Sequence, residues 1–406
     1  MNEYFLLQIE NLNNQKSEER LNSLRVLKNA IDKGDIQKPL FFNDVNNHIH
    51  TTYSFSPYSP TKALFMAYMN GLKTAGIMDH DSAAGCMEFI KAGQILDMPI
   101  TCGIEVRVRM EKTPLNGIRI NNPDQDSVAY VALHGIPHQY IKTIQDFMAP
   151  YRKERNVRNQ KMCDNINKLL GKYGICIDFN QDVLPLSLYG EGGTVTERHI
   201  SYALALKMLE KYGKGRSLVA FYKDTLNLPL SGKNEALLSD ESNPVYEYDL
   251  LGAIKSDLIS LFYIDAYDEC PDIHDIIDLC RKTKAISAYA YLGDVGNSVT
   301  GDKKPQKFED SYIDKLFEVL KELGFDAVTY MPSRNTKEQL IKVRALCEQY
   351  ELFQISGEDI NSPRQNFVCK AMRDPFFDNL RDSTYALIKH EQDATEDITK
   401  AMFYNK

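Results

Sequence analysis

The sequence predicts an α/β fold in which a parallel sheet or a closed barrel is covered by helices. Two groups of short apolar runs alternate with amphipathic helical stretches, one from about residue 43 and one near the other end of the chain. A helix-rich, charged segment, roughly residues 145–280, separates them. Because β-α alternation is typical of parallel sheets, we expect two parts of one sheet joined by a helical insertion.

Length and charge limit the classes of protein that the chain can represent. Its 406 residues suggest one to three domains, and 43% hydrophobic residues suffice for a sizeable core. Since 48 basic and 56 acidic residues give a net charge of −8, we expect neither a nucleic-acid binder nor an anionic-membrane binder. No apolar run reaches the roughly 18 residues of a membrane span, and the first residues do not resemble a signal peptide. The expected location is therefore cytoplasmic.

Seven runs have the character of strands. They cover residues 44–50, 75–78, 100–108, 127–134, 285–291, 327–330 and 353–356. Amphipathic periodicity predicts helices over 60–73, 82–96, 311–323 and 336–350. The eight cysteines form no C-x-x-C pair, which predicts buried free thiols.

These patterns divide the chain into five parts. We expect an N-terminal helical segment (1–40), a first part of the barrel (41–145), a helical insertion or lid (146–280), a second part of the barrel (281–370) and a C-terminal extension (371–406). Three arginines at the start of the insertion (Arg152, Arg155, Arg158) fall at helical spacing, and we interpret them as a solvated helix face.

Polar side chains of the kinds that bind metals stand where the predicted strands end. His48 and His50 close the first strand, and residues two apart in a strand point to the same face. His80 closes the second strand, and Glu105 interrupts an apolar strand where a carboxylate needs a cation or donors. Two more of these residues, His134 and Asp359, follow later strands. Since strand ends converge at the mouth of a barrel, we expect a site for zinc, manganese or iron.

Three motifs follow one another along the first strands. Residues 47–52 read N-H-I-H-T-T and precede Ser59-Pro60, residues 76–81 read G-I-M-D-H-D and precede Gly85, and residues 100–105 read I-T-C-G-I-E. In this order and spacing they resemble the motifs of the PHP (polymerase and histidinol phosphatase) phosphoesterase superfamily. Residues 196–200, T-E-R-H-I, resemble a segment near R-P-H-I-A in related phosphoesterases, and residues 322–326 and 355–359 match closing β-α units. The resemblance covers about residues 43–135 and 285–361.

The resemblance implies a distorted barrel of seven βα units with one to three divalent ions at its mouth. Carried over by position, the first metal site would use His48, His50, Glu105 and Asp359. The second would share Glu105 with His134, but the histidine expected within Ala288–Tyr291 is missing. The third would retain only His80, because Phe55 and Asn361 stand at its other two positions.

By this resemblance the chain would be a metal-dependent phosphoesterase that hydrolyses a small phosphorylated metabolite or nucleotide with metal-activated water. His80 and His199 would be catalytic, and the substrate-binding residues would be Arg198, Tyr289 and Asn361. His199 could instead be a helix-start histidine, and Arg198 a surface arginine. Two alternatives stay open, a catalytically silent PHP module that binds metal, ligand or partner and a different metal-dependent hydrolase. The sequence specifies neither substrate, native metal nor oligomeric state.

Overall fold

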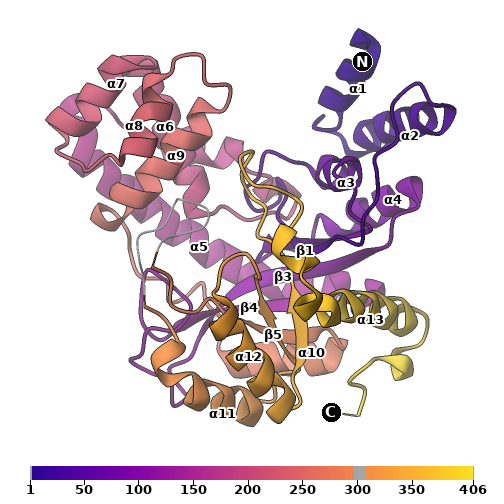
Figure 1. The fold of residues 1–406 in the computed structure, drawn as a ribbon. Helices are drawn as coiled ribbons and strands as arrows, with labels where there is room; N and C mark the ends of the chain where they lie inside the picture. Colours follow the sequence, from indigo (N-terminus) through magenta and orange to yellow (C-terminus); the bar gives the residue numbers. More distant parts are fainter. Residues whose placement is uncertain (1, 297–306, 406) are drawn as a thin grey trace.

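The computed structural model describes residues 2–296 and 307–405, and it contains one seven-stranded sheet in sequence order (Figure 1). The strands are β1 (Val45–Ile49), β2 (Thr74–His80), β3 (Ile100–Arg109), β4 (Val128–His134), β5 (Ile286–Ala290), β6 (Ala327–Tyr330) and β7 (Phe353–Ser356). The sheet curls until the segment after β7 meets β1. There Ile360 N donates to His48 O at 3.1 Å, and His50 N donates to Ile360 O at 2.9 Å. The α/β barrel-like architecture is thereby confirmed.

All seven predicted strands are present, with ends shifted by a few residues. The direction of one strand differs from the expectation. Strands β1–β3 are mutually parallel and so are β5–β7, but β4 is antiparallel to both neighbours. A parallel neighbour needs a long crossover, usually a helix, and no helix lies in the described connection between β3 and β4. The expectation that all strands end at one mouth is therefore wrong for β4.

Helices cover the barrel on the outside (Figure 1). Those packed around the sheet are α3 (Pro60–Met69), α4 (Cys86–Leu96), α10 (Ile273–Thr283), α11 (Ile313–Leu323), α12 (Lys337–Gln349) and α13 (Asp378–Glu396). Two N-terminal helices, α1 (Glu3–Asn11) and α2 (Ser17–Lys33), extend this layer beside α3 and α4. Helix α3 shows the local logic, because Ser59 caps its first turn and Pro60 occupies a position that needs no N–H donor.

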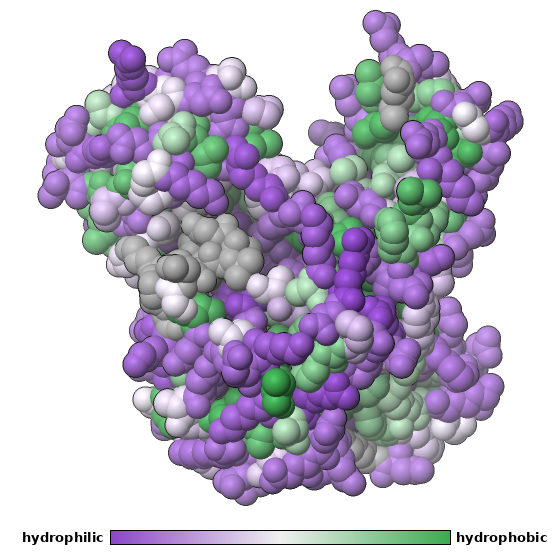
Figure 2. All heavy atoms as spheres, in the orientation of Figure 1, coloured by the Kyte–Doolittle hydropathy of each residue, from purple (hydrophilic) through white to green (hydrophobic). Residues whose placement is uncertain are grey.

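The insertion forms a lobe with its own apolar core (Figure 1). Its helices are α5 (Ile141–Leu170), α6 (Glu197–Tyr212), α7 (Arg216–Ala220), α8 (Gly232–Ser239) and α9 (Tyr246–Asp257). Figure 2 shows a notch in the molecular outline between this lobe and the N-terminal helices. Inside the barrel, a cluster of small and apolar side chains fills the end away from the predicted metal ligands. It includes Met78, Ala132 and Ala288. The polar residues of the barrel interior consequently lie toward one end.

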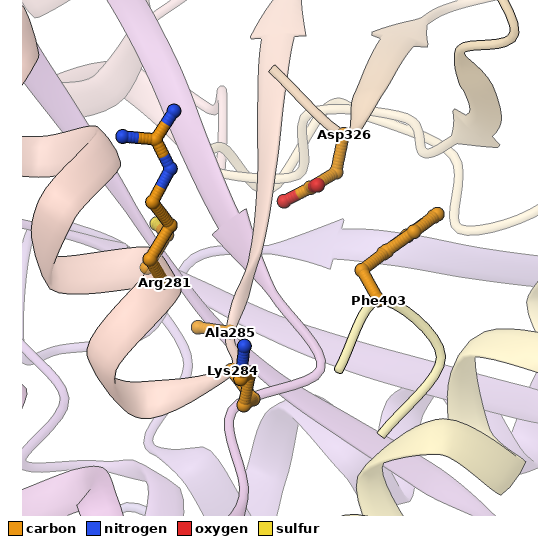
Figure 3. A pocket seen from close by; sticks show the side chains of 6 residues that line it. Arg281, Lys284, Ala285, Asp326 and Phe403 are labelled. Atoms are coloured by element: carbon orange, nitrogen blue, oxygen red, sulfur yellow. The ribbon is translucent and has the colours of Figure 1, made fainter. Parts of the chain in front are cut away.

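A small pocket marks the opposite end of the barrel (Figure 3). Ala285 and Asp326, which precede β5 and β6, line it together with Arg281, Lys284 and Phe403. It lies at the amino ends of these strands, away from the predicted metal ligands. Seven of the eight cysteines are buried free thiols as expected, whereas Cys176 is exposed. Among the described residues, no helix is long and apolar enough to cross a membrane.

Candidate metal centre at the barrel mouth

Four predicted ligands converge at the mouth, His48 and His50 from β1, Glu105 from β3, and Asp359 after β7. The two imidazole Nε2 atoms lie 3.2 Å apart. Glu105 Oε2 lies 3.7 Å from His48 Nε2 and 3.8 Å from His50 Nε2. Asp359 Oδ1 lies 3.2 Å from His50 Nε2. We refer to these four residues as the mouth ligand cluster.

These spacings fit a divalent ion. Tetrahedral zinc with bonds of about 2.0–2.2 Å places its ligand atoms about 3.3–3.6 Å apart. The four separations given above, 3.2–3.8 Å, scatter around that value. The ligand atoms that lie within 4.8 Å of one another form two overlapping groups, His48–His50–Asp359 and His50–His80–Glu105. Two imidazoles and two carboxylates are also a donor set that zinc, manganese and iron accept. The residues present therefore fit a metal, although they do not select one.

The chain path after β7 brings Asp359 to this cluster. A Cβ on Gly357 would lie 2.6 Å from His48 Cβ and 2.8 Å from His48 N, so only glycine permits the approach. Asn46 then joins the two segments, because its Oδ1 accepts from His48 N at 3.0 Å and from Glu358 N at 2.9 Å. Asn46 is fully buried. An asparagine inside a strand-like run needs hydrogen-bond partners when buried, and this is the sequence signal that could have identified it.

His50 is oriented by a hydrogen-bonded chain behind it. Its Nδ1 lies 3.3 Å from Ser54 Oγ, whose hydroxyl donates to Asp79 Oδ1 at 2.6 Å. Thr51 fixes Asp79 from the other side, since its backbone N–H and its hydroxyl both donate to that carboxylate at 2.6 Å. Such a relay places the proton of His50 on Nδ1 and leaves Nε2 free to bind a metal.

Glu105 is the common neighbour of the imidazoles. Its Oε2 lies 3.1 Å from His80 Nδ1, in addition to its contacts with His48 and His50. Burial alone would raise the pKa of Glu105, but the three histidines, His80 foremost, outweigh burial and lower the pKa to about 2. The His80 and His50 rings lie 4.6 Å apart, and burial holds the pKa of His80 well below its ordinary value. The cluster thus offers an ionised carboxylate beside a neutral His80.

His134 does not join this group. Since β4 is antiparallel to β3, Glu105 faces Ala132 and His134 lies deeper in the barrel. Neither imidazole nitrogen has a hydrogen-bond partner among the described residues, and burial lowers the pKa of His134 to about 3. The predicted position of His134 at the mouth, among the metal ligands, is therefore wrong. A role for His134 toward a second ion stays a proposal, motivated by its two unpartnered nitrogens.

The residue at the lost third-site position, Phe55, packs under the insertion. Its ring lies 5.0 Å from the His199 ring and 5.7 Å from the Tyr202 ring, both on α6. His199 Nδ1 accepts from Thr196 N at 3.0 Å and so caps α6. Burial lowers the pKa of His199 to about 3, so this imidazole is neutral. His199 therefore has the contacts of a helix-capping residue.

The three predicted substrate-binding residues have different surroundings. Arg198 is half-buried and lies close enough to Asp359 to help lower the pKa of that carboxyl, after the larger effects of His50 and His48 overcome burial. Asn361 Nδ2 donates to Asp359 Oδ1 at 2.6 Å and so orients a ligand. Tyr289 is fully buried in the core outside the barrel, and its hydroxyl donates to Glu309 Oε1 at 2.9 Å. The structure brings Arg198 and Asn361 to the mouth and leaves Tyr289 away from it.

Beside the mouth ligand cluster lies a second group of buried charges that the sequence analysis missed. The expected solvated face of α5 is wrong, because Arg152, Arg155 and Arg158 are all buried. Helix α5 packs this face onto the barrel mouth, where acidic residues from the segment after β2, from α6 and from the segment before α10 meet it. We call the following residues the ion-pair cluster: Arg107, Arg155, Arg158, Asp81, Glu197 and Glu269.

The ion-pair cluster is internally balanced. Arg155 pairs with Asp81 and, at 2.7 Å, with Glu197, while Arg158 pairs with Glu197 and Glu269. Arg107 of β3 lies 3.0 Å from Glu197 and also pairs with Glu269. Burial opposes ionisation of Glu197, but the arginines outweigh it and hold the pKa of Glu197 well below its ordinary value. Three arginines and three carboxylates therefore fasten the insertion to the barrel.

Known structures share this fold. No protein-family model matches the chain, and no curated protein matches its sequence. The chain resembles a proposed metal-dependent phosphoesterase from Bifidobacterium adolescentis ATCC 15703, with a TM-score of 0.52 and 16% identity over 87% of this chain and 97% of the other. It also resembles an amidohydrolase from Chromobacterium violaceum, solved with sulfate and without metal, with a TM-score of 0.50 and 15% identity over 80% and 90% of the two chains. At these identities the similarity shows the fold.

Proposed function

We propose that this chain is a metal-dependent phosphoesterase of the PHP type that acts on a small phosphorylated metabolite or nucleotide. The observation that carries the proposal is the convergence of His48, His50, Glu105 and Asp359, with neighbouring ligand atoms 3.2–3.8 Å apart. Similarity of fold to a proposed metal-dependent phosphoesterase supports it. One such four-residue site holds one ion, and further ions would need weaker ligand sets.

A divalent ion at this site would lower the pKa of a coordinated water and polarise phosphoryl oxygens. Access to it lies on the side of Asp359, whose side chain is 40% exposed whereas that of His50 is 1% exposed. Arg198 lies on this same side and carries the positive charge that a phosphate monoester needs. The substrate's phosphate would therefore enter between Arg198 and the mouth ligand cluster.

His80 is the residue best placed to handle a proton near the reacting group. It is 22% exposed, in contact with Glu105, and neutral because burial lowers its pKa. A neutral imidazole accepts or donates one hydrogen bond at each nitrogen, so His80 can orient the attacking water or the leaving oxygen. His199 lies under Phe55 and already accepts a backbone hydrogen bond, which favours His80 for this role.

The direct test is a panel of phosphomonoesters assayed after metal removal and re-addition of Mn²⁺ or Zn²⁺. We expect turnover that requires the added metal and disappears with chelator. Folded protein that binds metal but turns over no phosphomonoester would contradict the enzyme assignment and favour a silent module. That alternative is motivated by Phe55, which occupies a ligand position with an apolar ring.

A further inference from the structure

A second group of potential metal ligands lies outside the barrel, away from the mouth. Cys102 of β3, His138 at the start of the insertion and Glu391 of α13 each place one ligand atom within 4.8 Å of the other two. Successive residues of a strand point to opposite faces, so Cys102 faces outward whereas Glu105 faces the barrel interior. The sheet therefore separates this group from the mouth ligand cluster.

Glu391 is the unusual member of the group. Its side chain is only 2% exposed, and among the described residues no lysine or arginine pairs with it. Oε2 is fully used, because the Thr101 hydroxyl and Cys102 N both donate to it at 2.7 Å. Oε1 faces His138 Nε2 at 3.0 Å. Neutral donors satisfy Oε2, whereas Oε1 faces the His138 imidazole, where a bound cation would compensate the charge of the buried carboxylate.

A fourth donor lies nearby. Cys86, on α4, is buried like Cys102, and after burial its thiol contributes most to the raised pKa of the Cys102 thiol. Cys86 stands outside the group whose ligand atoms lie within 4.8 Å of one another, so binding would bring its sulfur closer to them. Two sulfurs, one imidazole nitrogen and one carboxylate oxygen make a four-ligand set, the number that closed structural zinc sites use. The two hydrogen bonds to Oε2 orient the carboxylate, as outer-shell partners do around metal ligands.

We infer that Cys86, Cys102, His138 and Glu391 form a structural site for a thiophilic divalent ion such as Zn²⁺. Binding would replace the thiol protons, which leave to solvent as the two sulfur–metal bonds form. His138, with 30% of its side chain exposed, gives the ion a path inward. The four ligands belong to α4, β3, the turn before α5 and α13, so the ion would link the first helix of the insertion and the C-terminal helix to the barrel wall.

Thiolate coordination gives this site a spectroscopic signature that the mouth ligand cluster lacks, since the mouth offers only nitrogen and oxygen ligands. Reduced, metal-free wild-type protein is titrated with Co²⁺ while the near-ultraviolet thiolate-to-cobalt charge-transfer band is recorded. We expect a band that saturates at one Co²⁺ per chain and disappears when Zn²⁺ displaces the cobalt. Absence of the band from folded wild-type protein overturns the inference.

Variants then assign the ligands. Cys102→Ser should abolish the band, whereas Cys369→Ser, a control at another buried cysteine, should keep it. If Cys102→Ser does not fold, His138→Ala decides, because this half-exposed residue tolerates truncation and its loss should weaken Co²⁺ binding by at least about tenfold. A band with unchanged affinity in His138→Ala, or unchanged intensity in Cys102→Ser, overturns the inference. Glu105→Gln should leave the band intact, which separates this site from the proposed activity.

Discussion

The mouth ligand cluster and the ion-pair cluster lie side by side at the same end of the barrel, and both bury carboxylates. In the ion-pair cluster, three arginines from the chain itself compensate Asp81, Glu197 and Glu269. In the mouth ligand cluster, the ion-pair partners of Glu105 and Asp359 are imidazoles, and the Nε2 atoms of His48 and His50 lie 3.2 Å apart. The first group is closed by its own cations, and the second is arranged to accept one from outside.

The type of countercharge distinguishes a structural group of buried charges from one that can bind a metal. Low carboxylate pKa values occur in both, about 2 for Glu105 and well below the ordinary value for Glu197. A perturbed pKa therefore does not distinguish them. The identity of the countercharge does, because a guanidinium is fixed and always charged whereas an imidazole can give its lone pair to a metal.

The largest expected effect on stability comes from removing one arginine of the ion-pair cluster. Arg155→Met leaves Asp81 and Glu197 without their shared partner, and removal of one partner from a buried pair costs about 3–5 kcal/mol. Urea unfolding should show that loss in the free energy of unfolding. The exposed pair Arg281–Asp278, whose side chains are 52% and 73% exposed, supplies the control, since Arg281→Met should cost no more than about 1 kcal/mol. Equal losses for the two variants would refute the distinction.

The second effect is the loss of metal and activity when a carboxylate of the mouth ligand cluster is changed. Glu105→Gln keeps the shape of the side chain but removes the charge that faces three histidines. We expect phosphatase activity to fall by about 100-fold or more, together with the metal content, because even outer-shell substitutions reach that size. Glu309→Gln, at another fully buried carboxylate, should leave metal content unchanged. Full metal and full rate in Glu105→Gln would remove β3 from the metal centre.

His80→Ala should reduce activity less than the change at Glu105 in the mouth ligand cluster. His80 is not a member of the mouth ligand cluster, but its ligand atom lies within 4.8 Å of those of His50 and Glu105, so these three residues form an overlapping group. We expect the hydrolysis rate to fall about tenfold, less than the roughly 10²–10⁴-fold that general acid–base groups usually contribute, while elemental analysis finds unchanged metal. Loss of the metal in this variant would mean that His80 is itself a metal ligand and belongs to the mouth ligand cluster.

The smallest effect concerns Glu309, a buried carboxylate with neither arginine nor histidine beside it. It accepts from the Tyr289 hydroxyl at 2.9 Å and from Gly293 N at 3.0 Å, and burial raises its pKa to about 7. Because the folded pKa exceeds the unfolded one, the stabilisation is complete below the unfolded pKa and is lost as pH rises through about 7. Between pH 6 and 7 this group alone should lower the free energy of unfolding by about 1 kcal/mol. An unchanged pH slope in Glu309→Gln would contradict this.

The sequence predicted much of this fold for a simple reason. Short apolar runs bounded by polar residues identified all seven strands, and polar residues at strand ends singled out His48, His50, Glu105 and Asp359. Strand direction was harder, because periodicity carries no direction. The helix-free connection before β4 was the available signal. The burial of Arg155 and Arg158 depends on carboxylates more than 25 residues away in sequence, so helical spacing alone suggested a solvated face.

Direct binding of a divalent ion by the mouth ligand cluster can be observed in a crystal. Diffraction from crystals soaked in Mn²⁺, recorded with the anomalous signal of manganese, tests it without reference to any substrate. We expect a peak within about 2.0–2.3 Å of His48 Nε2, His50 Nε2, Glu105 and Asp359. Well-ordered mouth residues without such a peak, or with manganese bound only elsewhere in the molecule, would contradict it.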